Sequence, residues 1–110
     1  MILRLKDQAI SKALALAINA KISSYGSVTK LRLNSCSRII EVELDLKGEV
    51  MPLRLTLRDY RFVHREGKLY LSIGTIESSR RWIESLADDY LRNREVELPE
   101  RYGKLIEKLL

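Results

Sequence analysis

The chain has 110 residues, of which 45% are hydrophobic and 32% are charged, a composition that excludes an intrinsically disordered chain and fits one globular domain at residues 1–110. The net charge of +5 favours an anionic partner over a cationic one. A single cysteine, Cys36, excludes an intrachain disulfide.

The start of the chain carries charges at Arg4, Lys6 and Asp7, which interrupt the apolar segment that a secretory leader needs. The longest uncharged run, Ala13 to Ala20, is far shorter than the roughly 20 residues that span a membrane. We therefore expect a cytoplasmic protein.

The first predicted element is a helix that begins near Gln8, with Asp7 as its N-cap because a carboxylate there accepts an unpaired backbone N–H. The helix ends before Gly26, which suits the left-handed residue past a helix end. An apolar stripe covers most of the circumference, as is typical of a helix buried on most of its surface. The stripe contains Ala9, Ile10, Ala13, Leu14, Leu16, Ala17, Ile18 and Ala20.

Two segments that alternate between apolar and polar residues predict the centre of an antiparallel sheet with one face in the core. A turn at Gly48-Glu49 pairs every inward residue with an inward partner, as with Leu44 and Leu53. The same register places Glu43 opposite Arg54. The inward residues are Ile40, Val42, Leu44 and Leu46 in one strand and Met51, Leu53, Leu55 and Leu57 in the other.

Two further strands complete the predicted sheet. The first has Leu31 and Leu33 inward, and the fourth follows a turn at Glu66-Gly67 that pairs Phe62 with Leu71.

The third strand changes phase, because its inward residues are odd-numbered up to Leu57 and even-numbered from Tyr60. One extra residue near Arg58-Asp59 accounts for this slip. We predict a β-bulge there, which curves the sheet.

Two helices close the predicted fold. The first has Ser78 or Ser79 as its N-cap, and Leu98-Pro99 opens the second because proline fits the first helical position. Their apolar stripes contain Trp82, Ile83, Leu86, Ala87, Tyr90 and Leu91, and then Tyr102, Leu105, Ile106 and Leu109. The fold class is α+β, a four-stranded curved antiparallel meander with an N-terminal helix and two C-terminal helices, in the order α-β-β-β-β-α-α.

No residue pattern points to catalysis or to a bound metal. His64 is the only histidine, and a zinc site needs several ligands. Cys36 has no neighbouring base that would activate its thiol, and the five glycines form no phosphate-binding loop. We therefore expect neither an enzyme nor a cofactor.

The outward residues of the predicted sheet run basic, acidic and basic from strand to strand, so they can neutralise one another. Tyr70 is the one outward aromatic, whereas sheets that bind single-stranded nucleic acid stack bases on several. Nucleic acid is therefore the least favoured partner. The charged outward residues are Lys30 and Arg32, then Glu41, Glu43 and Asp45, then Arg54, Arg58 and Arg61.

Three stretches resemble the small bacterial members of the tubular lipid-binding (TULIP-like) domains: Ile10 to Leu14, the hairpin LKGEVMPLRLTL, and Leu98-Pro99. Those domains share the order of a helix, four antiparallel strands and a helix, and the similarity covers most of the chain. They are usually exported and longer, so one copy of this chain would form half of such a tube. The resemblance implies a curved sheet that holds an apolar ligand against the first helix.

Two hypotheses of function follow. The first is a non-catalytic domain that binds an apolar ligand, such as a lipid or acyl chain, in a cavity between the sheet and the first helix. The second is a protein–protein interaction module or homodimeric scaffold, because exposed edge strands favour pairing with a second copy. We expect a homodimer, and a membrane surface stays open as a partner. The residues predicted to line the cavity are Leu14, Ile18, Leu55, Phe62 and Leu71.

Overall fold

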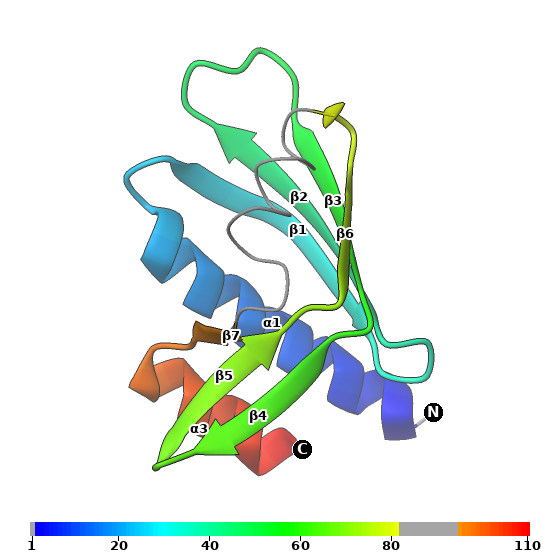
Figure 1. Cartoon of the computed structure of the whole chain (residues 1–110), viewed down its shortest axis with the longest axis vertical. Coiled ribbons are helices and arrows are strands. Elements are labelled where there is room, and N and C mark those ends of the chain that lie inside the picture. Colours follow the sequence, from blue (N-terminus) through cyan, green and yellow to red (C-terminus); the bar gives the residue numbers. More distant parts are fainter. Residues whose placement is uncertain (1, 82–94) are drawn as a thin grey trace.

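The computed structural model describes residues 2–81 and 95–110, with side chains from Leu5 onward. The described chain forms two helices and seven strands in two antiparallel sheets, which confirms the α+β class (Figure 1). Sheet A has the strand order β1-β2-β3-β6 and sheet B the order β4-β5-β7. The elements are α1 (Ile2–Ile22), β1 (Gly26–Asn34), β2 (Ile39–Leu46), β3 (Leu53–Arg58), β4 (Arg61–Arg65), β5 (Lys68–Ser72), β6 (Thr75–Ser78), β7 (Glu95–Glu97) and α3 (Glu100–Leu109). In these described ranges, neither helix is long and apolar enough to cross a membrane.

The centre of sheet A has the predicted register. Leu44 of β2 lies opposite Leu53 of β3, because this register puts both apolar rows on the same face. In the connecting turn, Gly48 takes a φ of 86°, which a residue with a side chain rarely adopts. Met51 was predicted to point inward, but it lies in the loop before β3 and is 65% exposed.

The third and fourth predicted strands are each broken in two at one shared corner. β3 ends at Arg58 and β4 begins at Arg61, while β5 ends at Ser72 and β6 begins at Thr75. Because β3 pairs with β6 and β4 with β5, one long hairpin folds over at this corner and carries sheet B out of the plane of sheet A (Figure 1). Asp59 redirects the chain with a left-handed φ of 56°. The irregularity predicted near Arg58-Asp59 is at the right place, but it ends strand β3 and does not form a bulge within one continuous strand.

The four predicted strands therefore become seven. Two of the additions come from the corner, and the third is β7, a strand of three residues whose Val96 pairs with Leu71. So short a strand shows no alternation that a sequence pattern could reveal. Leu57 and Tyr60, on either side of the corner, are both buried, as the phase slip requires.

The two described helices differ in detail from the prediction. α1 begins at Ile2, so Asp7 lies inside the helix and is not its N-cap. The residues before Asp7 are good helix formers, and nothing among them breaks the helix. α3 opens at Leu98-Pro99 as predicted, although Pro99 is its N-cap and not its first helical residue. Leu105 is 47% exposed and is not part of the buried stripe. The helix predicted around Trp82 to Leu91 lies outside the described residues.

Helix α1 runs along the outer edge of β1 and accepts hydrogen bonds from the backbone of β1 and of the turn after it. The pairs are Asp7 Oδ2 with the Ser35 N–H at 3.1 Å, Ser11 Oγ with the Leu33 N–H at 2.9 Å, and Asn19 Oδ1 with the Val28 N–H at 2.6 Å. A covered edge does not pair readily with another chain. Strand β1 is therefore not an exposed edge that could pair with a second copy of the chain.

We expect Ser11→Ala to lower the free energy of unfolding by about 1–3 kcal/mol, because it leaves the buried Leu33 N–H without its acceptor. Ser11 is 8% exposed, and its hydroxyl also donates to the Asp7 carbonyl at 2.7 Å. Urea denaturation measures the change, with Lys12→Ala at the exposed next residue as the control. An unchanged midpoint for Ser11→Ala would mean that this hydrogen bond contributes nothing.

One hydrophobic cluster joins both sheets and both described helices. Ile18 and Leu55, predicted to face the core, are half-buried. The predicted core residues found buried are Leu14, Leu33, Ile40, Val42, Leu44, Leu53, Leu57, Leu69 and Leu71.

Candidate functional site

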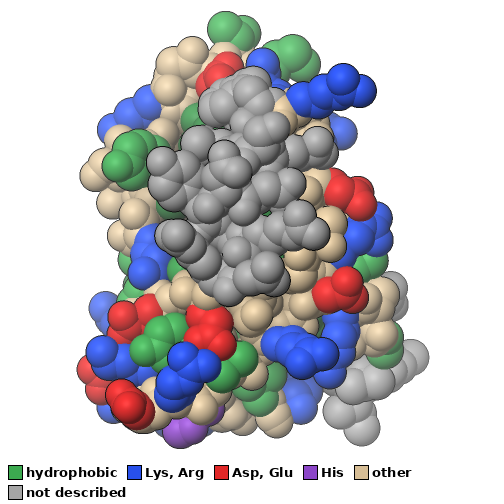
Figure 2. All heavy atoms as spheres, viewed as in Figure 1, with side chains coloured by type: hydrophobic (Ala, Val, Ile, Leu, Met, Phe, Trp, Pro, Cys, Tyr) green, Lys and Arg blue, Asp and Glu red, His purple; other side chains and the backbone are tan. Residues whose placement is uncertain are grey.

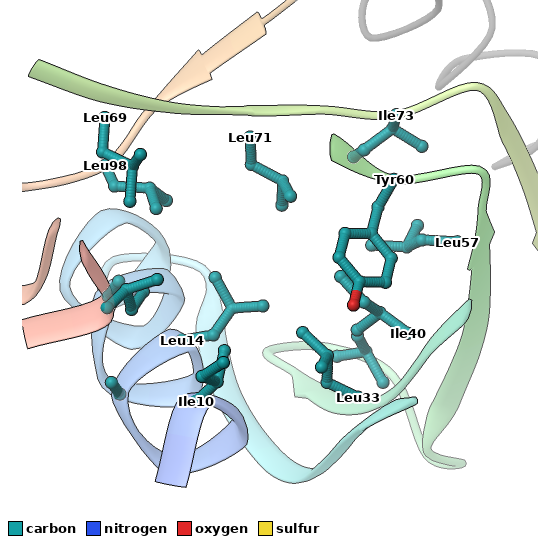
Figure 3. Close-up of a cluster of buried hydrophobic side chains, with 14 of the residues drawn as sticks. Ile10, Leu14, Leu33, Ile40, Leu57, Tyr60, Leu69, Leu71, Ile73 and Leu98 are labelled. Atoms are coloured by element: carbon teal, nitrogen blue, oxygen red, sulfur yellow. The ribbon is translucent and has the colours of Figure 1, made fainter. Parts of the chain in front are cut away.

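The interior of the molecule has two halves, a proximal half next to sheet B and a distal half at the end of sheet A farthest from sheet B. In the proximal half, Leu14 of α1, Leu71 of β5 and Tyr60 at the corner point toward one another (Figure 3). Their exposed fractions are 0%, 3% and 4%. The core is therefore closed around these three residues.

The five residues predicted to line a ligand cavity fall into three environments. Leu14 and Leu71 belong to the closed proximal core. Phe62 is half-buried and packs edge-to-face with Tyr60, with 5.6 Å between the ring centroids. Ile18 and Leu55 are half-buried at the margin of the core, toward the distal half.

The distal half carries a set of half-buried aliphatic side chains, which we call the distal apolar face. Its members come from α1, β1, β2 and β3, and each packs against the buried cluster while keeping part of its surface accessible. Between them, Val42, Leu44 and Leu53 form a buried floor. The distal apolar face consists of Ile18, Ile22, Val28, Leu31, Leu46 and Leu55.

The sequence analysis did not identify Val28 as an inward residue, because the strand is irregular next to it. The pairing of β1 with β2 shifts between Val28 and Lys30, so Thr29 is an extra residue that interrupts the alternation. Val28 lies opposite the inward Leu44 all the same. A bulge hides such a residue from a period-two pattern.

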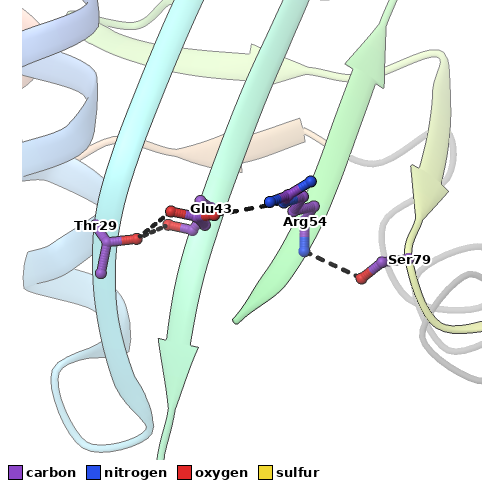
Figure 4. Close-up of polar contacts among 4 residues, drawn as sticks. All are labelled: Thr29, Glu43, Arg54 and Ser79. Carbon is purple, nitrogen blue, oxygen red and sulfur yellow. Dashed lines mark hydrogen bonds and ion pairs between the residues drawn. The ribbon is translucent and has the colours of Figure 1, made fainter. Parts of the chain in front are cut away.

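Two ion pairs between described residues lie on the outer face of sheet A, and one of them is the predicted pair of Glu43 with Arg54. Arg54 contacts Glu43 at 3.4 Å across the strands, and the Thr29 hydroxyl donates to the same carboxylate at 3.2 Å (Figure 4). Arg58 pairs with Glu77 at 2.7 Å, and this hydrogen bond raises the pKa of the Arg58 guanidinium.

A second charged region lies where α3 faces β5 and β7, around a pocket of ≈ 410 Å³. Its lysines are already paired, Lys68 with Glu97 at 3.1 Å and Lys104 with Glu100 at 3.2 Å. At its margin, His64 Nε2 lies 3.1 Å from a Glu107 carboxylate oxygen, which ties β4 to α3. The Lys68–Glu97 pair joins β5 to β7, whereas the Lys104–Glu100 pair lies within α3.

The corner of the long hairpin gathers polar groups around Tyr60. The Asp59 N–H donates to the Arg38 carbonyl at 2.9 Å, and both residues have a left-handed φ of 56°. An Arg38 guanidinium nitrogen donates to the Tyr60 carbonyl at 3.3 Å. Burial raises the pKa of the Tyr60 hydroxyl, and the Asp7 carboxylate raises it further. The phenol is therefore held in its neutral form.

This pKa shift predicts a loss of stability at alkaline pH. Because the pKa of folded Tyr60 lies above its unfolded value near 10, the stabilisation is complete below that pH and is lost as the pH rises toward the folded pKa. Tyr60→Phe should therefore weaken the alkaline loss of stability, whereas Tyr25→Phe, at a 70% exposed site, should not. Urea midpoints measured between about pH 8 and 11 decide this, and parallel curves for wild type and Tyr60→Phe would contradict it.

Comparison of the chain with known protein families, curated proteins and solved structures finds no match. Over residues 5–81 and 95–110, no three His, Cys, Asp or Glu side chains gather as a metal ion would need. Cys36 is a free, exposed thiol in the turn between β1 and β2. The distal apolar face is thus the candidate site that the geometry favours.

Proposed function

We propose that the chain is a non-catalytic binding domain whose ligand, a lipid or acyl chain, lies against the distal apolar face. The contrast within one interior carries the proposal. Leu14 and Leu71 in the proximal half are buried, whereas Ile18, Ile22 and Leu55 keep part of their surface accessible. Aliphatic side chains offer no hydrogen-bonding atom, so the contact they favour is with hydrocarbon.

The energetics set a minimum size for the ligand. Each methylene removed from water contributes about 0.8 kcal/mol, and micromolar affinity corresponds to about 8 kcal/mol. About ten methylenes are therefore required, and more once the cost of ordering the ligand is included. The proposal favours a long acyl chain over a small apolar molecule.

A protein-binding role is the second candidate, and the open edge of β4 favours it. Among the described strands, β4 pairs with β5 alone. In a homodimer built by antiparallel self-pairing about Val63, Arg61 would lie opposite Arg65, and like charges in that position destabilise a sheet. Sedimentation at micromolar concentration tests the expected homodimer, and a monomer would remove it.

The proposed function is tested by titrating the protein with a fluorescent long-chain fatty acid. Ile22→Asn and Leu55→Asn each place an amide on the distal apolar face. We expect each to weaken binding about tenfold, which corresponds to roughly 1.4 kcal/mol or the contact of about two methylenes.

Leu105→Asn is the matched control, because Leu105 is a 47% exposed leucine on α3 and outside the distal apolar face. Thermal unfolding of each variant confirms that it is folded at the temperature of the titration. Absence of binding to the wild-type protein, or equal affinities for all three variants, would remove the proposal.

A further inference from the structure

The distal end of the molecule carries an exposed apolar apex, formed by Tyr25, Val50 and Met51. Their exposed fractions are 70%, 97% and 65%. Tyr25 lies in the turn between α1 and β1, and the other two lie in the loop between β2 and β3. The Lys47 N–H donates to the Tyr25 carbonyl at 2.9 Å, which holds the turn against the loop.

The fold gives no reason for the apex to be apolar. Single exposed apolar residues are ordinary on protein surfaces, but Val50 and Met51 are adjacent in the loop between β2 and β3, which projects at the end of sheet A (Figure 1). A valine that is 97% exposed contributes almost no burial to folding. An exposed apolar group of this kind is typical of a surface that meets a membrane or another molecule.

We propose that the apex docks the protein on an anionic lipid bilayer. Val50 and Met51 would enter the boundary between headgroups and acyl chains, and Tyr25 has the amphipathic ring that favours the headgroup level. Lys21 and Lys47 are exposed beside the apex and have no ion-pair partner among the described residues, so they can attract anionic headgroups.

The surrounding charges are consistent with this partner. Glu49, in the same loop, is balanced by Arg80 at 3.6 Å. Among the described residues, Asp45 is the remaining acidic residue at this end. Figure 2 shows hydrophobic side chains at the top of the molecule with Lys and Arg side chains beside them.

Shape and area favour a bilayer over a protein. A stable protein interface takes roughly 800 Å² from each partner, and three side chains on a loop and a turn fall well short of it. A convex apolar tip needs a complementary pocket on a protein, whereas a bilayer accepts it without one. Two or three inserted side chains give weak and reversible binding.

The apex also adjoins the distal apolar face. The Tyr25 N–H donates to the carbonyl of Ile22, a member of that face, at 2.7 Å. Docking through the apex would therefore bring the distal apolar face close to the bilayer, which is a source of acyl chains. Membrane docking itself stands without the proposed ligand and is tested separately.

The experiment is co-sedimentation of the full chain with vesicles of phosphatidylcholine, with and without phosphatidylglycerol. We expect binding to the anionic vesicles, a loss of at least about tenfold in the double variant Val50→Asp/Met51→Asp, and a loss of roughly fivefold for each of Lys21→Gln and Lys47→Gln. Leu105→Asp is the control and should bind as the wild type does.

Three results would overturn the proposal. One is no binding of the wild type to either vesicle, and another is equal binding by the wild type and the double variant. The third is a double variant that changes the oligomeric state in sedimentation while its vesicle binding is unaffected. Titration with the fluorescent fatty acid in the absence of vesicles separates the two proposals, because the double variant should still bind that probe.

Discussion

Replacing Leu14 with alanine should lower the free energy of unfolding by about 2–5 kcal/mol, one of the largest effects expected of any substitution in the chain. Leu14 is fully buried, and it faces Tyr60 and Leu71 across the proximal core. The alanine leaves a cavity that close-packed neighbours fill only in part. Urea denaturation measures the loss through the midpoint.

Two further leucine-to-alanine variants are the comparisons for Leu14→Ala. Leu16→Ala alters a leucine that is 51% exposed on the same helix and should cost far less. Leu55→Ala alters a leucine of the distal apolar face and should fall between the two, because the side chain is half-buried. Equal losses for Leu14→Ala and Leu55→Ala would contradict the division of the interior into a closed half and a more open half.

Gly26→Ala should also be strongly destabilising, by about 3 kcal/mol, at the upper end of what overpacking costs. A Cβ atom at Gly26 would collide with the carbonyl oxygen of Asp45 on the neighbouring strand. That oxygen belongs to the backbone of β2, so no side-chain rotation relieves the clash. The strands would have to move apart where Gly26 pairs with Leu46.

Ser27→Ala, at the exposed next residue, is the control for Gly26→Ala and should leave the urea midpoint nearly unchanged. Gly26 was predicted to be a left-handed residue at the end of the helix, but its φ is not positive. A glycine is needed here because a side chain would collide with β2, and not because the backbone takes a left-handed φ. A midpoint for Gly26→Ala equal to that for Ser27→Ala would show that the two strands can separate at no cost.

The sequence predicts best those parts of the fold in which local pattern and tertiary contact agree. In the hairpin of β2 and β3, strict alternation and a glycine turn specify one register, and Glu43 lies opposite Arg54 as expected. The change of phase between Leu57 and Tyr60 also marks the corner between sheets A and B, because the inward residues on both sides of it are buried.

Other features depend on contacts that no local pattern encodes. A phase slip shows that a strand is irregular, but not that both strands of a hairpin turn together into a second sheet. Asp7 is a good N-cap by type, yet its carboxylate accepts from Ser35 of the turn after β1. That choice follows from α1 lying along the edge of β1, which is a property of the assembled fold.

The candidate site divides in the same way. Ile18 and Leu55 were identified from their apolar spacing, and both belong to the distal apolar face. Spacing could not separate them from Leu14, because a buried leucine and a half-buried one have the same pattern. The apex residue Val50 carries no periodic signal at all, and its exposure is apparent only from the structure.

The central claim is that an acyl chain binds the distal apolar face, and methyl-resolved NMR during titration with a long-chain fatty acid tests it most directly. We expect the methyl resonances of Ile18, Ile22 and Leu55 to shift with a common dissociation constant, while those of Leu14 and Leu71 stay in place. Shifts concentrated on Leu14 and Leu71, or no shift at any methyl group, would contradict the claim.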